Sequence, residues 1–233
     1  MSKNKKKKNK KDDDILKVKK SEQYRTAEEL MEKSEPNRAY YTLLILSSII
    51  VAAGLIVENA AVVIGGMMVT PVLTPILLIS LGVSVGDISF TKKTAIFVLK
   101  SLAVVFLGGL ILGILFGMDG KPTFFPLDNS LRGAVLYFIV ALAAGFSATL
   151  AWVRKQINEI LPGIAVAVAL VPPLALVGLG FSVLEIEVIR YNFFVFFFNL
   201  LGVLVGSLLV FSLLKFYKIE SKIEESEDSL DKE

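Results

Sequence analysis

The stretch GGMMVTPVLTPILLISLG, residues 65–82, carries no charged side chain and is nearly long enough to cross a lipid bilayer as a helix. It nevertheless contains two Thr-Pro pairs, ending at Pro71 and Pro75, and proline is unfavourable inside a helix. A second uncharged stretch, GIAVAVALVPPLALVGLG, occupies residues 163–180 and has a Pro-Pro pair in the corresponding place. The two stretches predict a pair of membrane-spanning segments whose helices are broken by proline.

The composition of the whole chain indicates an integral membrane protein. Hydrophobic residues make up 54% of the 233 residues, and only 15 charged side chains lie between residues 39 and 214. A soluble domain of this size does not contain several uncharged runs of about 20 residues, the length that crosses a bilayer. The predicted fold is an all-α membrane protein with six transmembrane helices, at about residues 39–57, 60–84, 98–117, 133–152, 160–183 and 192–214.

The regions outside the predicted spans are polar and rich in charge. Lysine-rich sequence at the N-terminus predicts disorder, and a capping box of Thr26 and Glu29 predicts the start of a short helix that ends near Pro36. The predicted regions are a disordered basic cytoplasmic tail (1–24), a short juxtamembrane helix (25–38), a first three-span repeat (39–117), an extracytoplasmic loop (118–132), a second three-span repeat (133–217) and an acidic cytoplasmic tail (218–233).

The positions of lysine and arginine predict the orientation. With the N-terminus inside, the cytoplasmic side collects the lysine-rich tail together with Lys92, Lys93 and Arg154, whereas the outer side holds three basic residues. Cytoplasmic loops of membrane proteins carry an excess of these residues. Both termini are therefore predicted to be cytoplasmic, in a multi-pass protein of the prokaryotic inner (plasma) membrane.

A fixed offset of 98 residues relates the two halves of the apolar region. A unit of three spans ends on the opposite side of the membrane from where it began, so a second copy is inverted relative to the first. Inverted repeats with interrupted spans in equivalent positions are typical of secondary transporters. The pairs at this offset are Gly65 and Gly163, Pro75 and Pro173, Gly82 and Gly180, Ser84 and Ser182, Val85 and Val183, Asp87 and Glu185, and Gly108 and Gly206.

The prolines are expected to free backbone carbonyls within the membrane. Pro71 and Pro75 lack an N–H, and their rings crowd the carbonyls of Met67 and Pro71. A freed carbonyl in hydrocarbon costs several kcal/mol unless protein, water or a ligand meets it. The neighbouring threonine hydroxyls either bind a solute or repair the helix internally. The predicted substrate site contains Thr70, Pro71, Thr74, Pro75, Pro172 and Pro173, and the alternative is a pair of kinked, fully packed helices.

Two further polar residues belong to the predicted site. Asn199 lies within the Phe-rich run NFFVFFFNLLGVLVG, residues 192–206, where its amide needs either a cross-helix partner or a solute. Glu58 either forms a tight polar turn with Asn59 or dips into the membrane as a proton or cation site.

Two glycine runs predict surfaces of close helix packing, within one chain or between chains. They are Gly109, Gly113 and Gly117 on the third span and Gly202 and Gly206 on the sixth. A homo-oligomer, a dimer or trimer, is expected, with these faces or the proline-bearing spans near the interface.

Part of this sequence resembles a known family. The segment AAGLIVENAAVVIGGMMVTPVLTPILLISLG, residues 52–82, followed by LPGIAVAVALVPPLALVGLG, residues 161–180, is similar to the prokaryotic membrane family often called the uncharacterised hydrophobic domain (domain of unknown function number three hundred and eighty-nine). The resemblance covers roughly residues 39–214. It implies the membrane architecture and brings no settled activity with it.

The residue types narrow the function classes. The chain contains no cysteine and no histidine, so neither disulfides nor the commonest metal ligand and proton shuttle are available. A nucleophile–base pair and a phosphate-binding motif are also missing from the sequence, so an enzyme is not expected, and neither is a cofactor, a metal or nucleic acid. We interpret the chain as a transporter or channel for a small solute or ion. The alternative is a non-transporting membrane scaffold or sensor subunit.

Overall fold

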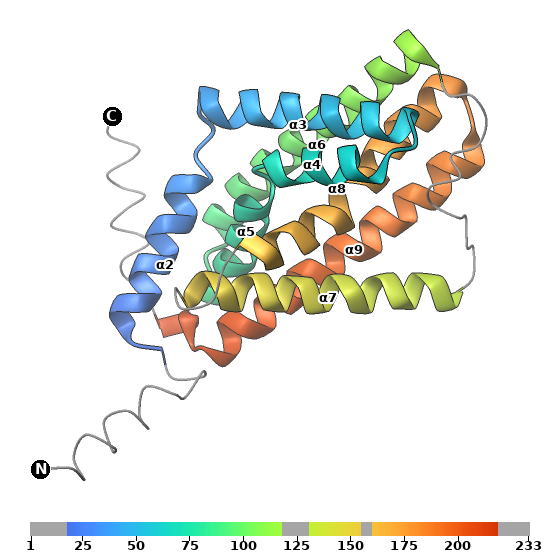
Figure 1. Ribbon diagram of the computed structural model, residues 1–233. Coiled ribbons are helices and arrows are strands. Elements are labelled where there is room, and N and C mark those ends of the chain that lie inside the picture. The colour runs from blue at the N-terminus through green and yellow to red at the C-terminus, as the bar shows by residue number, and fades with distance from the viewer. Residues whose placement is uncertain (1–17, 118–130, 155–159, 219–233) are drawn as a thin grey trace, which may run out of the picture.

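In a computed structural model the chain is helical throughout the part that is described, which comprises residues 18–117, 131–154 and 160–218 (Figure 1). The backbone alone is described at residues 131, 132, 134 and 160–169. The helices are α2 (Lys20–Lys33), α3 (Arg38–Ile56), α4 (Ala60–Val69), α5 (Leu73–Val85), α6 (Ile88–Phe116), α7 (Leu131–Val153), α8 (Ile160–Val183), α9 (Ile186–Leu213) and the short 3-10 helix η1 (Phe216–Lys218).

Four of these helices are long and apolar enough to cross a membrane: α3, α6, α9 and α7 from Val135 onward. The helices α4 and α5 meet at a 54° bend and qualify together as a fifth, broken span. This is the pattern of a multi-pass helical membrane protein. Helix α8 is 24 residues long, and counting it as the sixth span remains a prediction.

Two helices begin well before their predicted starts at residues 98 and 192. Helix α6 starts at Ile88, where the side-chain Oδ1 of Asp87 accepts a hydrogen bond of 2.9 Å from the Phe90 amide. Helix α9 starts at Ile186, directly after Glu185. Apolar composition locates the part of a helix that lies in hydrocarbon, whereas the backbone continues through polar residues to the next capping position. The two helices thus begin ten and six residues before the predicted apolar spans.

Three tight turns with the same hydrogen bonds connect consecutive helices. In each turn a residue with positive φ directly precedes the N-cap residue of the next helix, and the N-cap amide donates to a glycine carbonyl five residues earlier; the turn between α3 and α4 also contains Val57. The three bonds are Asn59 to Gly54 at 2.9 Å, Asp87 to Gly82 at 3.1 Å, and Glu185 to Gly180 at 3.0 Å. A side chain at any of these glycines would meet the following helix, at Val63, Thr91 or Ile189, within 3.0 Å. The glycines therefore let each helix pair fold back closely.

Two of these turns occupy equivalent positions in the two predicted repeats. Gly82, Asp87 and the positive-φ Gly86 of the first turn lie 98 residues before Gly180, Glu185 and the positive-φ Leu184 of the second. The helix pairings also correspond, because α6 packs on α3 and α5 while α9 packs on α7 and α8. The offset found in the sequence thus reflects a shared local structure. The inverted relation between the halves remains a prediction.

Helix α8 lies at the centre of the bundle. All of its residues from Leu170 to Gly180 are buried, against α6, α9, α7 and α3. Glycines of the predicted packing faces make this possible, because Gly109 approaches the carbonyl of Ala175 and Gly113 approaches Ser182. On the other side, Gly206 of α9 approaches the carbonyl of Leu142 on α7. Gly109, Gly113, Gly202 and Gly206 therefore pack within the chain, whereas a side chain at Gly117 would meet nothing within 4 Å, and the homo-oligomer remains a prediction.

Helix α2 lies across one end of the bundle, beside the ends of α5, α7 and α9 (Figure 1). The amide nitrogen of buried Gln23 donates to the Leu214 carbonyl at 2.7 Å, and Arg25 donates to the Val153 carbonyl at 3.3 Å.

The expected helix start at Thr26 was wrong. The helix begins at Lys20, where Glu22 accepts from the Lys19 amide, and Thr26 is buried in its second turn, bonded to the Glu22 carbonyl. The predicted disordered tail reached residue 24, but residues 20–24 already belong to α2, and the last two residues of the predicted loop, 131 and 132, belong to α7. The rest of that loop, residues 118–130, lies outside the described residues, as do residues 1–17 and 219–233 of the predicted tails.

Candidate functional site

The break between α4 and α5 is centred on Pro71. Helix α4 ends at Val69, Thr70 has extended backbone angles, and α5 begins at Leu73. At 1.5 Å per residue the ten residues of α4 place the break about 15 Å along the span, which is about half of a bilayer core. The expectation that Pro75 breaks the helix was wrong. Pro75 lies in the first turn of α5, where its missing N–H has no helical partner to lose.

The chain itself meets both carbonyls that the prolines free. The Met67 carbonyl accepts a hydrogen bond of 3.3 Å from the Thr70 amide. The hydroxyl of Thr74 lies 3.5 Å from the Pro71 carbonyl and donates to the Lys33 carbonyl at 3.2 Å. Because a hydroxyl has a single hydrogen, Thr74 donates to one of these two carbonyls at a time, and the shorter distance connects the break to the C-terminal end of α2, a contact between residues 41 positions apart.

The second proline segment does not form a break. Pro172 and Pro173 lie inside the continuous helix α8, so the expectation of a proline-broken fifth helix was wrong. Two adjacent prolines remove two backbone donors but leave the hydrogen bonds on either side intact, and the neighbouring helices hold the segment in place. The prolines are themselves buried, and the residues around them, Leu170, Val171 and Leu174, belong to the same core cluster as Met67 and Val72 beside the break.

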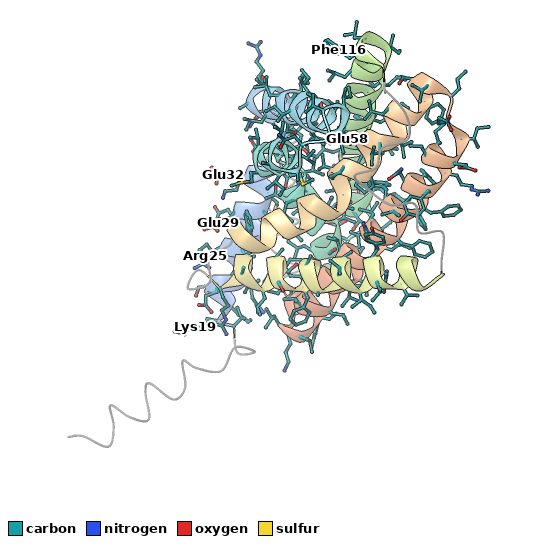
Figure 2. All side chains as sticks on the ribbon, turned by 45° about the vertical axis from the view of Figure 1, so that its right-hand side comes forward. Lys19, Arg25, Glu29, Glu32, Glu58 and Phe116 are labelled. Carbon is teal, nitrogen blue, oxygen red and sulfur yellow. The ribbon has the colours of Figure 1, made fainter. Side chains whose placement is uncertain are left out.

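The two remaining predicted site residues are Glu58 and Asn199. Glu58 occupies the turn between α3 and α4, with φ of 50°, and is exposed at the end of the bundle opposite α2 (Figures 1 and 2). This matches the tight polar turn that was one of its two interpretations. Asn199 is buried in the middle of α9 with 2% of its surface exposed. The structure therefore brings together Thr70, Pro71, Thr74 and Pro75, packs the other two prolines behind them, and separates Glu58.

Sequence reasoning missed the contribution of α2 and the end of α7 to this region. The ammonium group of Lys33 lies 4.7 Å from the centroid of the Trp152 ring, an arrangement that favours a cation–π interaction. Ser34, which follows Lys33, is 5% exposed, and Trp152 is 6% exposed. The chain's single tryptophan lies at the end of an apolar span, which is a signal for a position at the membrane–water interface. Its partner Lys33 lies 119 residues away in the sequence, so no local pattern connects the two residues.

Charged groups on α2 are arranged around this junction. Arg25 pairs with Glu29 at 3.6 Å, and Arg154 at the end of α7 pairs with Glu22 at 3.8 Å. Figure 2 shows Glu29 and Glu32 along the outer side of α2. The inner side of α2 is instead apolar and hydroxyl-bearing, with Ala27 and Leu30 packed into a cluster that contains Leu77, Trp152 and Phe211. The candidate site is thus a broken span closed at one end by an amphipathic helix.

Comparison with known proteins agrees with this architecture. Residues 67–205 match the family described as "Domain of unknown function (DUF389)". An uncharacterised protein of Methanocaldococcus jannaschii is 26% identical over 148 residues, a match that covers 63% of this chain and 45% of that relative. This chain therefore aligns with less than half of the relative's length. No solved structure matches the chain. Because the family match extends over more than half of the residues, the chain belongs to the DUF389 family.

Proposed function

We propose that the protein transports a small solute or ion across the membrane and that the α4–α5 break is the site where the solute passes. The observation that supports this proposal is the 54° bend, which places non-helical backbone about halfway along a span. Non-helical backbone at that depth is tolerated where it is buried in protein or lines a wet pathway, and broken helices in such positions bind solutes in secondary transporters.

Helix α2 is the element that controls access in this proposal. The Thr74 hydroxyl bonds the first turn of α5 to the Lys33 carbonyl, so a displacement of α2 changes the environment of the break directly. The continuous helix α8 forms the fixed wall behind the break, because its residues 170–180 are buried on all sides. The proposed pathway therefore involves one broken span, whereas the sequence had predicted two.

Flux through reconstituted vesicles tests the proposal. Purified protein in liposomes is assayed with a panel of potassium, sodium, chloride, phosphate, sulfate and acetate. We expect flux of at least one solute, and we expect Pro71→Ala to lower that flux at least tenfold, because alanine restores the amide and lets α4 and α5 join. Gly65→Ala is the matched control on the same span, since a Cβ added at this exposed position of α4 meets nothing within 4 Å, and its flux should equal that of the wild type.

The non-transporting alternative predicts that the protein causes no flux. A scaffold or sensor subunit would show no protein-dependent flux for any solute in the panel. Equal flux through Pro71→Ala and wild-type protein, with both correctly folded by gel filtration, would also contradict the assignment of the pathway to the break.

A further inference from the structure

Three polar side-chain atoms near the break have no hydrogen-bond partner among the described residues. They are the indole Nε1 of Trp152 and the hydroxyl oxygens of Ser34 and Thr70, and each is shielded from solvent. Ser34 and Trp152 are more than nine-tenths buried. A buried polar group without a partner has lost its hydrogen bonds to water, so three such atoms in one region are unfavourable unless something else meets them.

These groups belong to one junction. Lys33 connects its parts, because its ammonium group lies 4.7 Å from the Trp152 ring centroid while its carbonyl accepts from Thr74 in the first turn of α5. Ser34 is the next residue of α2, and Thr70 lies on the α4 side of the break. The junction is therefore formed by the end of α2, the break itself and the end of α7.

The first turn of α5 adds backbone donors to the same junction. The N-cap residue of this 13-residue helix is Val72, which provides no side-chain acceptor for the amides of the first turn. The N-terminus of a helix carries a partial positive charge and exposes N–H groups that have no helical acceptor. These amides and the Trp152 and Ser34 side chains are independent observations that indicate the same kind of ligand.

The hydrogen-bonding capacity that remains consists mainly of donors. An indole N–H and a lysine ammonium can only donate, and the two hydroxyls can donate as well as accept. The matching ligand accepts hydrogen bonds and carries negative charge. The acidic residues of α2 do not fulfil this role. Glu22 pairs with Arg154 and Glu29 with Arg25, while Glu28 and Glu32 are exposed, the latter along the outer side of the helix (Figure 2).

We propose that this junction binds an oxyanion, a carboxylate or phosphate group, held by Lys33, Ser34, Thr70, Trp152 and the first-turn amides of α5. The inference rests on the proposed transport function, for which it defines the substrate as an anion. A free solute and a phospholipid headgroup both present this oxyanion chemistry, and the binding experiment below distinguishes the two sources.

The single tryptophan allows a direct binding measurement. Trp152 fluorescence of the full chain in dodecyl maltoside is followed while inorganic phosphate, sulfate or acetate replaces chloride at constant ionic strength. We expect a saturable change with at least one of these anions. Lys33→Met should raise the apparent Kd at least tenfold, Thr70→Val should raise it severalfold, and Lys33→Arg should restore most of the affinity. Lys92→Met, an exposed lysine on α6, is the matched control and should bind as the wild type does.

Each outcome of this experiment decides the proposal. A saturable change with dispersed short-chain phosphatidylglycerol, in the absence of any response to the free anions, would assign the site to a lipid headgroup. No saturable response to any probe would overturn the oxyanion site, and so would equal affinities of Lys33→Met and Lys92→Met. If Lys33→Met does not fold, Ser34→Ala takes its place. Oxyanion binding without flux of any solute would refute the transport function but support the oxyanion site. Flux of cations without oxyanion binding would support transport and refute the oxyanion site.

Discussion

Single residues determine how closely the helices of this protein turn back on one another. The three turns that share a glycine carbonyl acceptor differ in the residue with positive φ, which is Glu58, Gly86 or Leu184. The left-handed conformation is unfavourable for residues with a side chain, by about 1–2 kcal/mol, and glycine adopts it without that cost. Two turns therefore carry strain that the third avoids.

Replacing Leu184 with glycine should stabilise the protein. Leu184 has φ of 58° and is 80% exposed, so the change removes strain and little packing. Glycine also raises the conformational entropy of the unfolded chain, which offsets part of this stabilisation. We therefore expect the free energy of unfolding to rise by about 0.5–1 kcal/mol. Thermal unfolding in detergent measures the effect. Gly86→Ala is the reciprocal variant and should destabilise by about 1 kcal/mol, and an unchanged melting temperature for both variants would show that the turns are not strained.

At the scale of elements, helix α2 is part of the folded bundle as well as a surface helix. It contributes Gln23 and Arg25 as donors to the last carbonyls of α9 and α7, and helix ends need such partners when they are buried. Its C-terminal carbonyl in turn receives the Thr74 hydroxyl from the break. The proposed control of access depends on these end-to-end contacts.

Removing one of these contacts should loosen α2 selectively. Gln23→Leu keeps the approximate size of the side chain but leaves the Leu214 carbonyl without its donor, at a cost of about 1–3 kcal/mol. We expect faster hydrogen exchange in α2 and at the end of α9, with unchanged exchange in α8. Ser21→Ala, an exposed position on α2, serves as the control. Equal exchange in Gln23→Leu and the control would mean that α2 is held by its apolar face alone.

At the scale of the whole molecule, the start and the end of the described chain meet. Gln23 contacts Leu214 across a separation of 191 residues, so α2 and the end of α9 lie at the same end of the bundle. An even number of crossings produces this arrangement, and six spans satisfy it. The lysine and arginine distribution predicts that this end is cytoplasmic.

Chemical labelling tests the predicted sidedness. The chain has no cysteine, so single cysteines at Lys121 and Lys218 can be labelled without a background. We expect a membrane-impermeant maleimide added to intact cells to label the first and to reach the second only after the membrane is opened. Labelling of both positions from the same side would be incompatible with six spans.

The sequence by itself determined the class of the protein and the place of one break. Long uncharged runs have to form helices in a bilayer, because only helices satisfy every backbone group within one segment. The Thr-Pro pairs near Pro71 also marked a position where the helix ends, and the 98-residue offset marked two turns of equal structure.

The tertiary structure alone decided which prolines break a helix and what surrounds the break. Pro172 and Pro173 are as unfavourable locally as Pro71, yet α8 stays continuous because neighbouring helices bury it from Leu170 to Gly180, whereas the residues at 70 and 71 are only half-buried. The junction of Lys33, Thr74 and Trp152 was equally inaccessible to sequence reasoning. Its members come from three helices that are far apart in the sequence. Local residue patterns indicate only contacts within a turn or two of one helix, whereas contacts between distant segments form when the bundle packs.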